Sequence, residues 1–214
     1  PHEMDTAIKY DSIMITQNSY TYHPDWDTCF KRGYYDEVSN LLDGLVVREP
    51  YFLHVFAAGN TQGQCFENGY RTIGSGYTSA KNIIAVGAIN KYDQMSNFSS
   101  WGPTRDGRLK PEVCAPGVGL ATTNTNNRYR SGVSGTSLAC PVVSGTMSQL
   151  YELYMQQFNK KPEASVIKAI VCNTALDMGN TGPDFKFGFG KLNAVGASRA
   201  IVDQNFIYDS ISHG

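Results

Sequence analysis

A serine stands at the start of a long apolar segment, in the run Gly-Thr-Ser-Leu-Ala-Cys-Pro at residues 135–141. The apolar residues that follow, up to about Phe158, predict a largely buried helix. At the N-terminus of such a helix, backbone N–H groups and the positive end of the dipole lie beside the oxygen of Ser137. Ser137 is therefore a candidate nucleophile. The same residues also suit ordinary helix capping by Thr136 or Ser137, with Pro141 in the first turn.

Acyl transfer also requires a base, a group that orients the base, and donors for the developing oxyanion. Asn60 closes a predicted strand in the run Ala-Ala-Gly-Asn at residues 57–60. Its amide could point over the carboxyl edge of a parallel sheet, where ligands bind in open α/β folds. Gly-Asn is also a frequent turn pair, so a simple turn is the alternative. Among the histidines, His54 lies inside a predicted strand, which favours a packed core position over a role as the base.

Three other chemistries fit less well. The glycine loop at residues 132–137 has no lysine of a phosphate-binding loop, and the histidines lack the helical spacing of a zinc hydrolase. The run Gly-Thr-Ser-Leu-Ala approximates the nucleophile elbow of α/β-hydrolases, with Asp177 or Asp203 and then His213 in the required order. However, an elbow follows a buried strand, and residues 124–134 are polar. An esterase of this kind stays open as a weaker alternative.

Helices and strands alternate along the chain. Apolar residues recur at helical spacing in residues 38–46, 142–158 and 162–175, and a short final helix is predicted at residues 193–202. Compact apolar runs at residues 51–58 and 83–89 predict buried strands, with shorter candidates at 13–16, 113–115 and 118–122. Nearly continuous apolar strands between helices predict a mainly parallel sheet covered on both faces. The expected fold class is α/β, with three α/β/α layers.

Composition excludes some partners. The 214 residues carry 18 Lys plus Arg and 19 Asp plus Glu, so neither nucleic acid nor an anionic membrane is expected as a partner. No apolar run approaches the roughly 20 residues that span a membrane. The five cysteines have no metal-ligand spacing, and we interpret them as structural. A bridge between Cys29 and Cys65 is an open alternative.

Five blocks of sequence carry a resemblance to a known family. They are Ala-Ala-Gly-Asn at 57–60, Phe-Ser-Ser-Trp-Gly-Pro through Lys-Pro-Glu-Val-Cys-Ala-Pro-Gly at 98–117, Gly-Thr-Ser-Leu-Ala-Cys-Pro at 135–141, Ile-Lys-Ala-Ile through Asn-Thr-Ala at 167–175, and Gly-Phe-Gly-Lys-Leu-Asn-Ala at 188–194. Their types and order resemble the C-terminal two-thirds of the catalytic domain of subtilisin-like serine proteases (subtilases). The Gly-Thr-Ser-x-Ala-x-Pro block resembles the family's nucleophile signature.

The resemblance implies roles for individual residues. Ser137 would attack the scissile carbonyl, and the Asn60 side chain and the Ser137 N–H would hold the oxyanion. Losing such an asparagine costs about 10²–10³ in turnover. The stretch ending in Asn18, Ser19 and Tyr20 would bind an extended substrate through β-type hydrogen bonds. The resemblance also implies that Ala57, Ala58 and Gly59 line the pocket for the residue before the cut bond.

The departures concern the rest of the triad. In subtilisin the order is Asp, His, Ser, so acid and base should precede the oxyanion strand. Neither the Asp-Thr-Gly nor the His-Gly-Thr motif occurs in this chain. We expect the Asp and His to lie on a preceding segment, either of the same parent protein or of another polypeptide, and this chain alone to be inactive. The alternative is a subtilase-like binding or structural module without activity.

The remaining expectations rest on the same resemblance. Residues 1–206 would form a partial subtilase catalytic domain, and residues 207–214 would begin a following segment. No cofactor is needed for catalysis, although structural calcium is common in subtilases. The partner would be a protein or peptide substrate, and the location extracytoplasmic or secreted.

Overall fold

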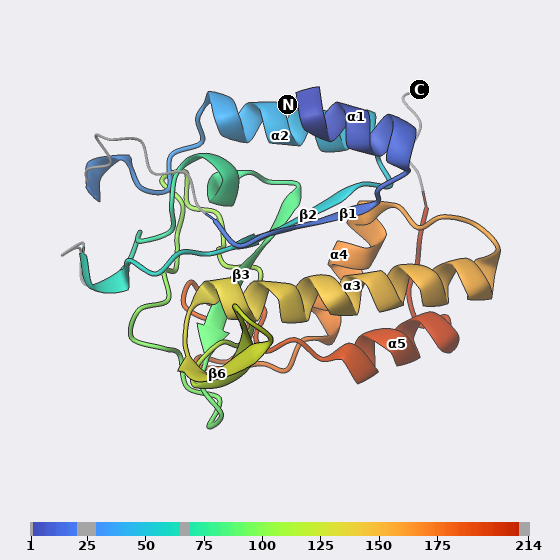
Figure 1. Cartoon of the computed structure of the whole chain (residues 1–214). Coiled ribbons are helices and arrows are strands. Elements are labelled where there is room, and N and C mark those ends of the chain that lie inside the picture. The colour runs from blue at the N-terminus through green and yellow to red at the C-terminus, as the bar shows by residue number, and fades with distance from the viewer. Residues whose placement is uncertain (1, 21–28, 65–68, 210–214) are drawn as a thin grey trace.

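The computed structural model describes residues 2–20, 29–64 and 69–209 (Figure 1). Four parallel strands form its central sheet, in the order β1-β2-β3-β4. They are β1 (Ile15–Asn18), β2 (Leu53–Ala57), β3 (Ile83–Ile89) and β4 (Val113–Pro116). Every residue of β2 and β3 is buried, as the continuous apolar runs of these segments predict.

Helices cover both faces of this sheet. The five helices of the described residues are α1 (His2–Asp11), α2 (Glu37–Arg48), α3 (Thr136–Phe158), α4 (Ala164–Thr174) and α5 (Ala194–Val202). In Figure 1, α1 and α2 lie above the strands, and α3 and α5 lie below them. The alternating residues Leu53 and Val55 pack with α3, whereas Phe56 packs with Leu42 of α2. This arrangement confirms the predicted three-layer α/β/α fold.

Helix α2 shows how local sequence sets these elements. Its N-cap residue Asp36 accepts a hydrogen bond from the backbone N–H of Ser39, and the Ser39 hydroxyl completes a capping box. Leu42, Leu45 and Val46 form its buried face. The predicted apolar stripe is confirmed for these three residues, whereas Leu41 of the same stripe is exposed.

The structure differs from the sequence prediction in several places. Helix α1 and strand β6 (Arg128–Val133) were not predicted, because neither segment has a clear apolar period. Strand β6 pairs with β5 (Leu120–Asn124) in an exposed antiparallel hairpin. Strand β1 begins two residues later than the predicted run. Pro162 precedes the N-cap residue Glu163 and so lies outside α4 instead of in its first turn. Short 3-10 helices cover Cys29–Lys31, Gln62–Gln64 and Gly76–Ser79.

Candidate active site

Ser137 is the second residue of α3, next to the carboxyl ends of β1 and β2. The N-cap residue is Gly135, and it makes no side-chain cap. The prediction that Thr136 or Ser137 caps the helix is therefore wrong. Both hydroxyls are instead used in contacts between distant parts of the chain, Thr136 with residues 59 and 60 and Ser137 with residue 19.

Pro141 is the sixth residue of α3, so the prediction that it lies in the first turn is also wrong. A proline here cannot donate the usual helical N–H bond to the carbonyl of Ser137. That carbonyl accepts a hydrogen bond of 2.8 Å from the Ser19 hydroxyl instead. The proline thus leaves the carbonyl of the candidate nucleophile without its helical donor, and the hydroxyl of Ser19, the residue after β1, takes the place of that donor.

The Ser137 hydroxyl donates to the backbone carbonyl of Ser19 at 3.2 Å. A backbone carbonyl is too weak a base to activate a serine, so this contact orients the hydroxyl without deprotonating it. His54 is fully buried, and its Nδ1 lies 2.7 Å from the Thr16 hydroxyl. Burial lowers the pKa of His54 from 6.5 to about 4. The predicted core position of His54 is confirmed.

Asn60 is held in one orientation by the first residue of α3. Its Oδ1 accepts hydrogen bonds from the Thr136 N–H and the Thr136 hydroxyl, each 2.9 Å long. The Thr136 hydroxyl also accepts the N–H of Gly59 at 3.3 Å. Gly59 has φ +110°, a conformation that favours glycine. Because its oxygen is occupied by Thr136, Asn60 has its Nδ2 donors available for another acceptor.

A cavity of about 140 Å³ brings these groups together. Besides Ser137, its lining includes five residues predicted to act in catalysis or substrate binding. It also includes two residues, Thr61 and Thr136, for which the sequence predicted no role in the site. The predicted lining residues are Ser19, Tyr20, Ala57, Gly59 and Asn60. Thr136 sits beside Ser137 in the nucleophile block, but nothing in that block indicated its contact with Asn60.

Two predicted substrate-binding residues do not line this cavity. Ala58 is fully buried, and Asn18 is 4% exposed. The Asn18 amide donates to the Val55 carbonyl and to the Thr16 hydroxyl, at 3.1 and 2.9 Å. The side chain of Asn18 thus joins β1 to β2, and a substrate role for these two residues stays a prediction.

Tyr20 forms an aromatic wall beside the cavity. Its hydroxyl donates to Asn18 Oδ1 at 2.9 Å. Its ring packs edge-on against Phe56 and Tyr77, with centroids 5.9 and 5.7 Å away. Burial raises the pKa of the Tyr20 phenol, and the neighbouring Tyr77 adds to the shift. Tyr20 therefore stays neutral at physiological pH.

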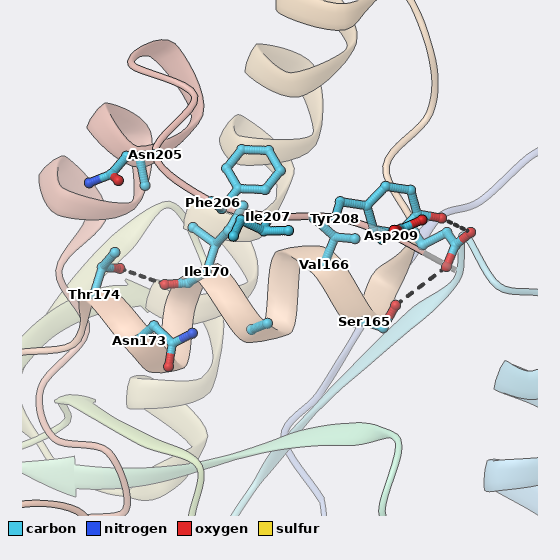
Figure 2. A pocket seen from close by; sticks show the side chains of 13 residues that line it. Ser165, Val166, Ile170, Asn173, Thr174, Asn205, Phe206, Ile207, Tyr208 and Asp209 are labelled. Atoms are coloured by element: carbon cyan, nitrogen blue, oxygen red, sulfur yellow. Dashed lines mark hydrogen bonds between the residues drawn. The ribbon is translucent and has the colours of Figure 1, made fainter. Parts of the chain in front are cut away.

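A larger cavity, of about 600 Å³, lies between α4 and the segment at residues 205–209 (Figure 2). Its lining contains none of the residues around Ser137. The Tyr208 hydroxyl donates at 2.6 Å to the carboxylate of Glu163, the N-cap residue of α4. Both of the charged residues in its lining, Glu163 and Asp209, are acidic.

The cysteines of the described residues fall into two groups. Cys114, Cys140 and Cys172 are buried free thiols, and burial raises the pKa of Cys140 to about 11 and that of Cys172 to about 12. These values make the two thiols unreactive, in agreement with a structural role. Cys29 is disulfide-bonded, and Cys65, the partner left open above, lies outside the described residues. At least one cysteine is thus not a free structural thiol.

Within residues 2–20, 29–64 and 69–209, no three His, Cys, Asp or Glu side chains form a group that could hold a metal ion. The same residues contain no helix long and apolar enough to cross a membrane.

A model of the subtilase family of peptidases (peptidase S8) matches residues 4–190, and the chain belongs to this family. Among curated proteins, the chain is 39% identical over 118 residues to a thermophilic serine proteinase of Bacillus sp. (strain AK1) and 30% identical over 124 residues to bacillopeptidase F of Bacillus subtilis (strain 168). These alignments cover 55% and 56% of this chain, but only 26% and 8% of the relatives.

Solved structures show the same fold. The self-cleaved protease domain of PatA aligns with a TM-score of 0.72 at 23% identity, covering 94% of this chain and 66% of that one. The prenylagaramide maturation protease PagA aligns with a TM-score of 0.73, also at 23% identity, covering 94% and 65% of the two chains. The chain therefore spans about two-thirds of these structures and a smaller part of the curated relatives.

Proposed function

We propose that this chain carries the nucleophile and the oxyanion hole of a subtilisin-type serine endopeptidase. The observation that carries the proposal is the double hydrogen bond from Thr136 to Asn60 Oδ1, which leaves the Nδ2 donors of Asn60 free beside Ser137. Donors fixed before the reaction stabilise a developing oxyanion without reorganisation. A bare scaffold has no need for an amide held in this way.

In the proposed reaction, Ser137 Oγ attacks the carbonyl carbon of a peptide bond and gives its proton to a base. The oxyanion accepts hydrogen bonds from the Ser137 N–H and Asn60 Nδ2. Collapse of the tetrahedral intermediate breaks the C–N bond, and the leaving amine takes the proton back from the base. Water then hydrolyses the acyl-Ser137 ester by the same steps in reverse.

The base and its orienting carboxylate would come from a segment other than this chain. The Ser137 hydroxyl meets the Ser19 carbonyl, and His54 is buried against Thr16. The strand β1 pairs with β2 along one edge in the described residues. We propose that the Asp and His approach Ser137 from the other edge of β1, on the same parent protein or on another polypeptide.

The proposal is tested with a fluorophosphonate probe, which labels activated serines. We expect the isolated chain to be unlabelled and inactive on casein, because only oxyanion and binding effects remain without a base. The parent protein should be labelled, and Ser137→Ala should abolish the labelling. Strong labelling of Ser137 in the isolated chain would contradict the incomplete triad. An unlabelled parent would favour the inactive binding module instead.

The α/β-hydrolase alternative is less consistent with the local topology. A nucleophile elbow follows a buried strand of the main sheet. The strand before Ser137 is β6, which belongs to a separate exposed hairpin. We retain the domain boundary near residue 206 as a proposal, since α5 ends at Val202.

We also propose an extracytoplasmic location. Disulfides persist mainly in oxidising compartments, and Cys29 is disulfide-bonded. A protein or peptide is the proposed substrate, bound along the residues that follow β1. The near-balanced charge of the chain supports neither nucleic acid nor membrane as a partner.

A further inference from the structure

The backbone conformation of residue 135, the N-cap of α3, does not require a glycine. Its φ is 162°, extended backbone that any residue adopts. By contrast, Gly59 has φ +110°, where a side chain would be strained. The backbone of Gly135 is fixed by its N–H, which donates to the Gly117 carbonyl at 2.8 Å, and its carbonyl, which accepts from Leu138 at 3.0 Å.

Packing does not require glycine at this position either. A Cβ on Gly135 would meet no atom closer than 3.6 Å, which is ordinary van der Waals contact. A Cβ on Gly117 would lie 2.8 Å from Ala88 Cβ and 2.8 Å from the Gly135 carbonyl oxygen. Gly117 is therefore a glycine that folding requires, and Gly135 is not.

The atoms nearest to the missing Cβ are the two proposed oxyanion donors. Asn60 Nδ2 would lie 3.6 Å from this carbon, and the backbone N of Ser137 would lie 3.7 Å from it. The Cβ of Ser137 follows at 3.9 Å. The space that a side chain of residue 135 would fill is thus the space beside both donors.

We propose that Gly135 is glycine because the oxyanion and its carbonyl group use this space. The inference rests on the proposed function, and it adds a residue that shapes the oxyanion hole without donating to it. A methyl group here would crowd an oxygen that must come within about 3 Å of both nitrogens. The oxygen of the tetrahedral intermediate depends on this close approach to the two nitrogens more than the carbonyl oxygen of the bound substrate does.

The test compares four variants of the parent protein that carries the Asp and His segment. Gly135→Ala should keep the melting temperature within about 4 °C of wild type, the shift typical of small changes in a chain of this size. It should lower kcat on a peptide substrate by at least about 100-fold, with KM nearly unchanged, as for loss of one oxyanion donor. Gly145→Ala is the matched control, since a Cβ there meets nothing within 4 Å and the residue is exposed on the same helix. Its kcat should equal that of wild type.

A double-mutant comparison distinguishes obstruction of the oxyanion hole from a general effect on the structure. In Asn60→Ala, one donor is already lost, so adding Gly135→Ala should cost much less than it does alone. Additive losses in the double variant, wild-type kcat in Gly135→Ala, or a drop in melting temperature well beyond 4 °C would each overturn the inference. Absence of fluorophosphonate labelling in the wild-type parent would instead overturn the proposed function, and this inference with it.

Discussion

Ser19 and Ser137 are joined by two hydrogen bonds of opposite direction. The Ser19 hydroxyl donates to the Ser137 carbonyl at 2.8 Å, and the Ser137 hydroxyl donates to the Ser19 carbonyl at 3.2 Å. The first bond exists because Pro141 has no N–H for that carbonyl. The segment proposed to bind substrate is thereby held against the residue proposed to attack it.

Ser19→Ala should weaken the alignment of Ser137 more than it weakens the fold. Ser19 is exposed, so water can replace its hydroxyl, and we expect the free energy of unfolding to fall by less than about 1 kcal/mol. The rate of fluorophosphonate labelling of the parent protein should fall by up to about 100-fold, the effect of misplacing a reacting atom by 1 Å. Ser19→Thr keeps the hydroxyl and serves as the control. Equal labelling rates in wild type and Ser19→Ala would refute the alignment role.

Thr136→Val should disturb Asn60 while keeping the volume of the side chain. The buried N–H of Gly59 loses its acceptor, and Asn60 Oδ1 loses one of its two donors. We expect a loss of about 1–3 kcal/mol in the free energy of unfolding, measured by urea denaturation. Peptidase activity of the parent should fall as well. Thr136→Ser retains the hydroxyl and its hydrogen bonds, so its stability and activity should stay close to those of wild type. If Thr136→Ser is as impaired as Thr136→Val, the lost methyl group is responsible instead of the hydrogen bonds.

His54 should make stability depend on pH. Burial lowers its pKa from 6.5 to about 4 in the folded chain. Between these values the unfolded chain binds a proton that the folded chain does not, so stability falls as the pH is lowered through this window. The loss at full extent is on the order of 3 kcal/mol.

The check is urea unfolding of wild type and His54→Leu at several pH values between about 4 and 7. The free-energy difference between the two proteins should change across this window, because the variant lacks the titrating ring. A constant difference from pH 7 to pH 4 would show that His54 is not the group responsible.

Glu112→Gln should be strongly destabilising. Glu112 Oε1 lies 2.7 Å from Lys110 Nζ and 2.9 Å from Lys168 Nζ, and Oε2 accepts the N–H of Ala85 at 2.7 Å. Burial alone would raise the pKa of Glu112, but the two lysines outweigh it and lower the pKa. Removing the carboxylate leaves buried lysine charge without compensation, at a cost of about 3–5 kcal/mol.

The matched control for this prediction is Asp93→Asn. Asp93 pairs with Lys191 at 2.7 Å, but its side chain is 52% exposed. Solvent screens such a pair, so the free energy of unfolding should change by less than about 1 kcal/mol. Similar losses in the two variants would contradict the distinction between buried and exposed pairs.

Elements with strong apolar patterns, and side chains capable of catalysis, are predictable from the amino-acid sequence. Strands β2 and β3 follow from continuous apolar runs, and α2 and α3 from helical spacing. Ser137 stood out beside the start of a predicted helix and Asn60 at the end of a predicted strand, although β2 itself ends earlier, at Ala57. Hairpin strand β6 and helix α1 escaped prediction, since exposed elements lack that pattern.

The assembly of the site, in contrast, depends on contacts between residues far apart in the chain. Thr136 is a candidate cap of its own helix by sequence, but its hydroxyl holds Asn60, 76 residues earlier in the chain. Ser19 meets Ser137 across 118 residues, through a carbonyl that Pro141 leaves free. Such contacts depend on which strand ends the parallel sheet places side by side. A local pattern records which donors and acceptors a residue carries, whereas the packing of the sheet against α3 determines which of them meet.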